Sequence, residues 1–186
     1  IQYSSEPPGA LETAGGIANA LPLLCKSSSL TSPAQAGEES VFAVINSDIW
    51  CDYDFVRLPA LAEQMQRNHD NAHLVLVDNP AHHPDGDFHL RDRRILPTND
   101  QRLTTNDLKF TFSGIGIYQP SLFTHIARGT KAPLAPLLRE QIARGKVSGE
   151  HHRGLWVDVG TPQRLAELDS QICSLQKTSR TQHNAT

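Results

Sequence analysis

The stretch "GLWVDVGTPQRLAEL", residues 154–168, decides which fold class is expected for this chain. An apolar strand, "LWVDV", leads into a glycine turn, after which Thr161 suits a helix N-cap and Pro162 the first helical position. Asp158 stands between two valines of that strand, and burying a carboxylate costs several kcal/mol unless something is paired with it. The stretch therefore predicts a strand–turn–helix unit that holds a charged group in need of a partner.

Strand and helix patterns alternate through the rest of the chain. The continuous apolar run "VFAVI" at 41–45 is typical of a strand buried on both faces, as in parallel sheets, and "HLVLV" at 73–77 is expected to be another buried strand. Residues 109–118, "KFTFSGIGIY", form a longer strand pattern whose central glycines indicate close approach of a ligand or another backbone. Helical patterns are found at 15–24, at 54–68, where Pro59 must lie near the start or break the helix, and at 133–145. The alternation predicts an α/β fold with a mostly parallel sheet flanked by helices.

The chain of 186 residues is long enough for one sizeable core, and no internal repeat divides it. Residues 1–172 are therefore expected to form a single domain. The Ser-, Pro- and Gly-rich residues 27–40 are expected to form a loop. Residues 173–186 are polar, and we expect them to be a disordered tail.

The composition excludes several classes of protein. With 17 Lys and Arg against 20 Asp and Glu, the formal net charge is −3, and no basic stripe suggests a nucleic-acid partner. No apolar stretch approaches the ~18 residues that span a bilayer, and nothing resembles a signal peptide. The three cysteines, Cys25, Cys51 and Cys173, are far apart and form no C-x-x-C motif, which argues against zinc or a disulfide framework. A reduced, cytoplasmic protein without a membrane partner is expected.

Two aspartates follow apolar strand patterns and are candidates for a metal site. Asp48 follows the strand in "VFAVINSDIW", and Asp158 lies in "LWVDVGTP". Ligands of open α/β sheets bind beyond the carboxyl ends of the strands, and Mg²⁺ typically takes one or two carboxylates plus phosphate oxygens. Aspartate is also a common turn residue. The pattern therefore leaves two roles open for this pair, magnesium binding and turn formation.

Three further features each have two interpretations. The glycines of "LETAGGI", residues 11–17, could admit a base or phosphate at a helix N-terminus, or allow tight packing. Tyr118 and the glycines of "SGIGIY" could line a sugar pocket or fill the core. The adjacent pairs His82-His83 and His151-His152 lack the H-x-x-x-H spacing of a helical zinc site, so we predict surface histidines rather than metal ligands.

Taken together, these features resemble the sugar-phosphate nucleotidyltransferase family. The resemblance rests on "LETAGGIANALPLL", on "VINSDIW" and on "WVDVGTP", and it covers residues 1 to about 172. It implies the Rossmann-like fold of the nucleotide-diphospho-sugar transferases. Within the family, "DNPAHHPDGDF", "KAPLAPLLR" and "VSGEHHRGLWVDVGTPQRLAEL" are similar to the uridylyltransferases of Gram-negative cell-wall recycling, whose substrate is N-acetylmuramate α-1-phosphate.

The resemblance implies a reaction in which a sugar-1-phosphate attacks UTP and releases pyrophosphate, with Mg²⁺ as cofactor. Two alternatives stay open: a mannose-1-phosphate guanylyltransferase that uses GTP, and a sugar-phosphate-binding domain without catalysis. A glycine loop that cradles the triphosphate would distinguish the enzyme from the binding domain, because its presence supports the enzyme.

The resemblance also implies a role for individual residues. Asp48 and Asp158 match the family's two magnesium-binding aspartates, so Mg²⁺ would be the partner that Asp158 needs. Asn46 and Asp87 match positions that hold the sugar phosphate. Glu12 and Gly16 match the turn that faces the uracil ring.

The sequence departs from the family pattern in two places. Ser47-Asp48 stands where the family usually has Gly-Asp. The loop G-x-G-x-R-x-x-P-x-T and the lysine that follows it have no counterpart, so the residues around the triphosphate are not assigned. The chain opens at Ile1 with what looks like a strand already in progress. We therefore expect the C-terminal portion of a nucleotidyltransferase domain, with N-terminal strands missing and no UDP-sugar synthesis by residues 1–186 alone.

Overall fold

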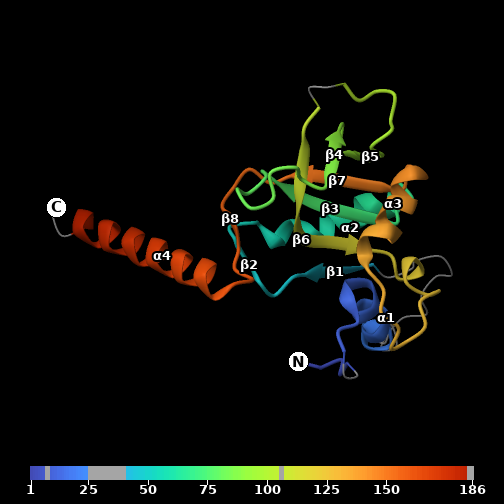
Figure 1. Cartoon of the computed structure of the whole chain (residues 1–186), viewed down its shortest axis with the longest axis horizontal. Helices are drawn as coiled ribbons and strands as arrows, with labels where there is room; N and C mark the ends of the chain where they lie inside the picture. Colours follow the sequence, from blue (N-terminus) through green and yellow to red (C-terminus); the bar gives the residue numbers. More distant parts are fainter. Residues whose placement is uncertain (7–8, 25–40, 105–106, 184–186) are drawn as a thin grey trace.

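A computed structural model describes residues 1–6, 9–24, 41–104 and 107–183, with side chains up to Cys173. The loop expected at 27–40 lies outside these residues. A six-stranded sheet occupies the centre of the molecule, helices lie against it, and the last helix projects away (Figure 1). Residues 1–4 form no strand; they run beside the first helix, where the Asn19 side chain donates hydrogen bonds to Ser4 Oγ and Ser5 O at 3.0 Å each.

The central sheet has the strand order β1-β6-β3-β7-β5-β4. These strands are β1 (Phe42–Ile45), β6 (Lys109–Tyr118), β3 (Ala72–Val77), β7 (Val147–His151), β5 (Arg94–Leu96) and β4 (Phe88–Arg91). A separate two-stranded sheet pairs β2 (Ile49–Cys51) with β8 (Trp156–Asp158).

The expected α/β class is confirmed, because helices flank a central sheet that contains parallel strands. β3 and β7 are parallel neighbours, and β1 has the same direction as β3 because both are antiparallel to β6. The expectation of mostly parallel pairing is wrong for the described strands, since β6 runs in the reverse direction between β1 and β3. The carboxyl ends of β1, β3 and β7 nevertheless meet at one edge of the sheet.

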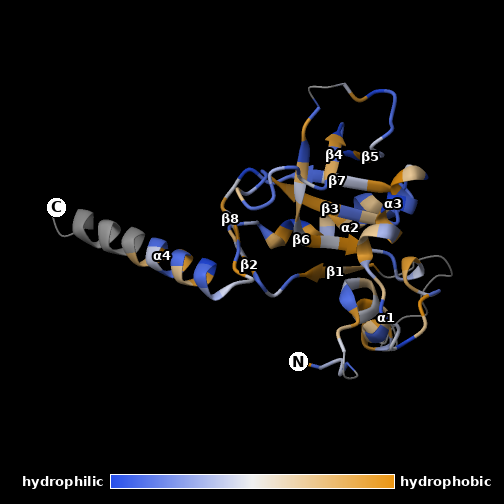
Figure 2. Ribbon diagram, viewed as in Figure 1, coloured by the Kyte–Doolittle hydropathy of each residue, from blue (hydrophilic) through white to orange (hydrophobic). Residues whose placement is uncertain are grey.

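Helices cover both faces of the sheet. α1 (Glu12–Leu24) and α3 (Leu134–Ala143) bury apolar side chains against one face of β3, the face of Leu74 and Leu76. α2 (Leu58–Arg67) packs Leu61 and Met65 against Ile117 on the other face, with Pro59 in its first turn as expected. Two short 3₁₀ helices lie at Phe55–Arg57, directly before α2, and at Pro120–Leu122, just after β6. Figure 2 shows the apolar residues gathered on the central strands.

The apolar run at 41–45 was expected to be buried on both faces, but β1 is buried on one face only. Phe42 and Val44 are partly buried, whereas Ala43 and Ile45 are exposed. The physical reason is packing: Phe42 and Val44 face the cluster that contains α1 and α3, whereas α2 on the other face packs its buried side chains against Ile117 of β6. The run at 73–77 matches its prediction, since every residue of β3 is buried.

The helix after Asp158, α4 (Pro162–His183), is longer than expected. It continues through residues 173–183, which corrects the prediction of a disordered tail for that part. The reason is local: after Pro162 the sequence has no Gly or Pro before the helix ends. Leu168 is buried, Leu165 is 55% exposed, and the helix points away from the sheet (Figures 1 and 2). No helix of the described chain combines the length and apolar character needed to cross a membrane.

Candidate active site

The small β2–β8 sheet brings Asp48 and Asp158 together. Ile49 is paired with Asp158 in the antiparallel register, and Val159 N–H donates to Asp48 O at 2.8 Å. A Cβ atom placed on Gly160 would lie 3.0 Å from Asp158 Oδ1 and 3.1 Å from Asp48 Oδ2. The two carboxylates therefore converge on one point. Their proximity was expected from the ends of parallel strands, but an antiparallel pair that the sequence did not predict produces it.

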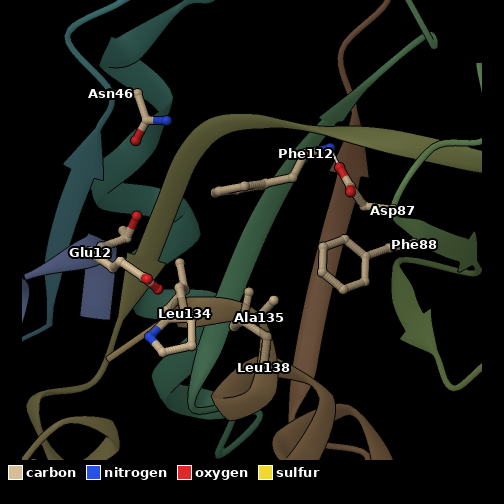
Figure 3. A pocket seen from close by; sticks show the side chains of 10 residues that line it. Glu12, Asn46, Asp87, Phe88, Phe112, Leu134, Ala135 and Leu138 are labelled. Carbon is tan, nitrogen blue, oxygen red and sulfur yellow. Dashed lines mark hydrogen bonds between the residues drawn. The ribbon is translucent and has the colours of Figure 1, made fainter. Parts of the chain in front are cut away.

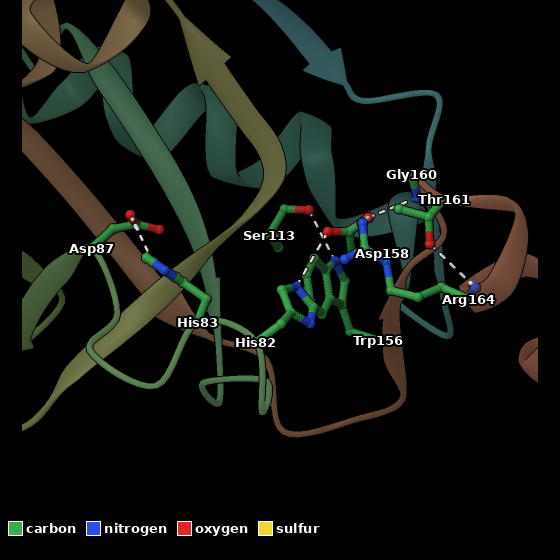
Figure 4. A network of polar contacts seen from close by, with 9 residues as sticks. All are labelled: His82, His83, Asp87, Ser113, Trp156, Asp158, Gly160, Thr161 and Arg164. Carbon is green, nitrogen blue, oxygen red and sulfur yellow. Dashed lines mark hydrogen bonds and ion pairs between the residues drawn. The ribbon is translucent and has the colours of Figure 1, made fainter.

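The two aspartates differ in their protein partners. Asp158 Oδ1 accepts hydrogen bonds from Gly160 N–H at 2.8 Å and from Arg164 Nη2 at 3.0 Å, and Oδ2 lies 3.4 Å from His82 Nε2 (Figure 4). The Asp48 side chain is exposed and has no hydrogen bond or ion pair with any described residue. One carboxylate is thus held in place, and the other is available to a ligand.

This pair fits the ligand preference of Mg²⁺. Magnesium binds hard oxygen ligands and commonly takes one or two carboxylates together with water and phosphate oxygens. The described residues contain no group of three or more His, Cys, Asp or Glu side chains that could hold a metal. A magnesium ion at Asp48 and Asp158 would therefore take its other oxygens from substrate and water.

A bulge in β6 positions Asn46. The register between β3 and β6 shifts after Val75, leaving Ser113 and Gly114 unpaired in the ladder. Gly114 has φ +82°, and a Cβ there would lie 2.9 Å from the Asn46 side chain. Gly114 O accepts from Asn46 N–H at 2.9 Å, and Ser113 O accepts from Trp156 Nε1 at 2.9 Å. The central glycines of 109–118 therefore permit a close approach, as predicted.

The loop after β3 presents Asp87 and two histidines. Asn79 organises this loop: its side-chain amide donates to Pro84 O at 2.9 Å and to Lys109 O at 3.0 Å. Asp87 Oδ2 accepts from Phe112 N–H at 2.8 Å, and its Oδ1 lies 3.1 Å from His83 Nε2. Asp87 is therefore oriented by the backbone of β6 and by a histidine of its own loop.

Sequence reasoning missed the relation of His82 and His83 to the predicted site. Each contacts one predicted site carboxylate, Asp158 and Asp87 respectively (Figure 4). Adjacent residues in a regular strand or helix diverge, so only the irregular loop allows both contacts, and spacing could not predict it. The second pair is partly buried rather than fully on the surface: the His151 and His152 side chains are 16% and 14% exposed.

Two further residues near the carboxylates were not predicted to be functional. Arg164 lies in the first turn of α4, and its Nε is buried without a hydrogen-bond partner in the described structure. Trp156 lies close to Asp158, and its Nε1 donates a hydrogen bond to Ser113 O (Figure 4). Both are part of the stretch 154–168, so their closeness in sequence to Asp158 was a signal that could have identified them.

Two cavities share this region. The first, of about 420 Å³, contains Glu12, Asn46 and Asp87 in its wall; Glu12 and Asn46 lie on one side and Asp87 on the other (Figure 3). Its other walls are mainly apolar, from Phe88, Phe112, Pro133, Leu134, Ala135 and Leu138. The second, of about 340 Å³, contains Asp48, Asp158, His82 and His83. Asn46 and Phe112 line both cavities, so the two cavities are neighbours and together form the candidate site.

Glu12 has an uncommon backbone conformation. Its φ of +59° lies in the left-handed region, which costs a non-glycine residue of order 1–3 kcal/mol. Gly15 beside it has no room for a side chain, since a Cβ would lie 2.4 Å from Thr130 O. Gly16 lines neither cavity, and a Cβ there would meet Glu6 Oε1 at 2.9 Å. The structure therefore brings Glu12, but not Gly16, to the cavity wall.

The two interpretations of Tyr118 are resolved in favour of the core. Tyr118 is 1% exposed, packs edge to face with Phe123, and lies over Gly116. Burial raises the pKa of its hydroxyl above the ordinary value. It is a packing residue and does not line either cavity.

The fold is that of the nucleotidyltransferases, as comparison with solved structures shows. A candidate glucose-1-phosphate thymidylyltransferase of Bacillus anthracis, solved with sucrose, superposes with a TM-score of 0.60 at 14% identity, covering 91% of this chain and 62% of that one. HddC of Yersinia pseudotuberculosis, solved with GMP-PN, gives 0.58 at 16% identity, covering 89% and 64%. These similarities establish the fold alone. No family model matches the chain.

Sequence similarity is more specific. The chain is 46% identical over 171 residues to N-acetylmuramate α-1-phosphate uridylyltransferase of Neisseria meningitidis, covering 91% of this chain. It is 29% identical over 177 residues to the enzyme of the same name from Caulobacter vibrioides, covering 92%. The chain spans 66% of the length of each relative, just under two thirds. The resemblance to the sugar-phosphate nucleotidyltransferases is thereby confirmed.

Proposed function

We propose that this protein is a sugar-1-phosphate uridylyltransferase that joins UTP to N-acetylmuramate α-1-phosphate, giving UDP-N-acetylmuramate and pyrophosphate. The observation that carries the proposal is the 46% identity to the Neisseria meningitidis uridylyltransferase over 171 residues. The geometry agrees with it, because Asn46 lines both a cavity of about 420 Å³ and the neighbouring cavity that holds the two converging carboxylates. The same proposal makes the protein a cytoplasmic enzyme of peptidoglycan recycling.

In this proposal the first cavity holds the sugar. Its apolar walls suit the ring face and the acetyl methyl group, while Asn46 and Asp87 supply hydrogen-bond acceptors and, from Asn46, donors. Glu12, which the resemblance assigns to the turn facing the uracil ring, lines the same cavity and is placed at its sugar side in this proposal. Asp87 accepts a hydrogen bond from Phe112 N–H and lies beside His83, so its carboxylate is oriented before a sugar arrives. A preoriented acceptor loses less conformational entropy on binding.

The second cavity then holds the phosphates. An oxygen of the sugar phosphate attacks the α-phosphorus of UTP, a new P–O bond forms, and the bond to the β-phosphate oxygen breaks as pyrophosphate leaves. Such transfers depend on positioning and on neutralisation of the developing charge. Mg²⁺, when bound by Asp48 and Asp158, would supply that neutralisation. Arg164, 3.0 Å from Asp158, holds the carboxylate in a fixed orientation.

The test uses the protein as its gene encodes it. Purified enzyme with UTP, N-acetylmuramate α-1-phosphate and Mg²⁺ should release pyrophosphate and form the UDP-sugar, both detectable by a coupled assay and by mass spectrometry. GTP with mannose-1-phosphate serves as the competing pair. Turnover of the second pair alone would overturn the assignment in favour of the guanylyltransferase alternative. Binding of N-acetylmuramate α-1-phosphate without turnover of either pair would favour a binding domain.

A further inference from the structure

The charge of the first cavity does not match the substrate proposed for it. Muramate differs from N-acetylglucosamine by a lactyl ether, which carries one carboxylate. Of the described residues lining the cavity, the charged ones are Glu12 and Asp87, both acidic. A substrate carboxylate among these groups would be repelled and only partly hydrated. A cation at the edge of the cavity is therefore needed.

Lys131 is a cation at this edge. Its Nζ lies 3.0 Å from Glu12 Oε1, and the Lys131 side chain is 66% exposed. Among the described residues, it is the only lysine or arginine ion-paired with a residue of the cavity wall. An ammonium group has three N–H donors, and the pair with Glu12 occupies one side of it. The remaining donors are free to meet a second carboxylate.

The backbone on which Lys131 stands is held against α1. Ala132 N–H donates to Leu11 O at 2.9 Å, and Gly15 N–H donates to Ala132 O at 3.0 Å. Gly15 makes this approach possible, because any side chain there would collide with Thr130 O. Pro133 and Leu134, which follow directly, line the cavity. The flexible side chain of Lys131 therefore starts from a defined place beside the cavity.

We infer that Lys131 is a specificity-determining residue, whose ammonium group binds the carboxylate of an acidic sugar phosphate at the edge of the first cavity. This inference rests on the proposed function. The ammonium group would distinguish the acidic sugar from its neutral counterpart, N-acetylglucosamine α-1-phosphate, which has the same ring and phosphate but no lactyl carboxylate. The phosphate end of the site is not involved in this discrimination.

The test measures binding of the two sugar phosphates by calorimetry, with Mg²⁺ present throughout. The unmodified chain should prefer the acidic sugar. Lys131→Gln should weaken binding of the acidic sugar about tenfold, as expected for loss of a hydrogen bond to a charged group, and leave the neutral sugar unchanged. Lys131→Arg should retain the preference. Arg128→Gln is the matched control: Arg128 is exposed in the same segment, has the same charge, and has no ion pair among the described residues.

A double variant, Glu12→Gln with Lys131→Gln, separates attraction by Lys131 from repulsion by an unpaired Glu12. The inference requires that the preference stays lost in the double variant; its return would overturn the inference. The inference would also be overturned if the Lys131→Gln variant kept the preference, or if its binding of both sugars were weakened equally. An unmodified chain that binds both sugars equally well overturns the role of Lys131 and leaves the sugar-phosphate site standing. Binding of neither sugar overturns the proposed function as well.

Discussion

Asp158 lies next to a cation and a backbone N–H group, and these contacts explain how a carboxylate is accommodated between two valines. Gly160 N–H and Arg164 hold Oδ1, and His82 lies near Oδ2. Asp48, by contrast, has its carboxylate free of described partners. At the scale of single residues, the candidate site thus combines one fixed carboxylate with one that can receive a ligand.

Replacing Asp158 by Asn should weaken Mg²⁺ binding and lower turnover, each by about tenfold or more, because a neutral amide is a poor magnesium ligand. The amide oxygen can still accept from Gly160 N–H, so stability should change little. Calorimetric titration with Mg²⁺ measures the first effect independently of activity. Asp169→Asn, an exposed carboxylate on α4, is the control. Unchanged Mg²⁺ affinity would assign Asp158 to the turn instead.

Replacing Asp87 by Ala should raise the KM for the sugar phosphate about tenfold and leave the KM for UTP nearly unchanged. The reason is that Asp87 lines the first cavity, opposite Glu12. Asp85→Ala removes a neighbouring exposed carboxylate and should change neither constant. Equal increases for both substrates would indicate that the loss of the Phe112 N–H acceptor disturbs β6, and hence a structural role.

At the scale of elements, two irregular features shape the site. The β2–β8 ribbon joins residues 49–51 to 156–158 and places Asp48 beside Asp158. The bulge of β6 turns the carbonyl groups of Ser113 and Gly114 toward Trp156 and Asn46. Bulges are over-represented next to active sites, where they reorient side chains.

Gly114→Ala should destabilise the protein and weaken sugar-phosphate binding. Its φ of +82° is unfavourable for alanine by about 1–3 kcal/mol, and the new Cβ would meet Asn46 at 2.9 Å. Gly129→Ala is the matched control, because Gly129 has φ +76° with nothing within 4 Å. Denaturant unfolding of both variants separates backbone strain from the collision. Full sugar-phosphate affinity in the Gly114 variant would contradict a role of the bulge in placing Asn46.

At the scale of the whole molecule, a buried histidine should make stability depend on pH. His73 in β3 is 2% exposed; its Nδ1 lies 2.9 Å from Ser148 Oγ, and its Nε2 has no partner in the described structure. Burial lowers the pKa of His73 from 6.5 to about 4. Between these values the unfolded chain binds a proton that the folded chain does not.

The free energy of unfolding should therefore fall as the pH decreases from 6.5 to about 4, by ~3 kcal/mol from this group, and level off below. Urea unfolding at pH 7.0, 5.5 and 4.5 measures this dependence. His73→Gln should remove most of it, whereas His125→Gln, at an exposed position, should not. The same pH dependence in the His73 variant would assign it to other groups.

Local pattern alone determined much of the architecture. The buried strand at 73–77, the strand at 109–118 with a close approach at its glycines, and the helix after Thr161 all follow from apolar spacing and from Gly and Pro. These features depend on interactions between near neighbours in the chain. The same holds for the choice of Asp48, Asp87, Asn46 and Asp158 as candidates, which came from short motifs and the family resemblance.

Tertiary structure alone decided which of these residues meet. The reversed direction of β6, the pairing of β2 with β8, and the contact of His82 with Asp158 join segments far apart in sequence. Such contacts depend on the packing of the whole chain and leave no periodic signal in any one segment. For the same reason the sequence did not indicate that Lys131 lies beside Glu12, since the two residues belong to distant parts of the chain that meet only in the folded molecule.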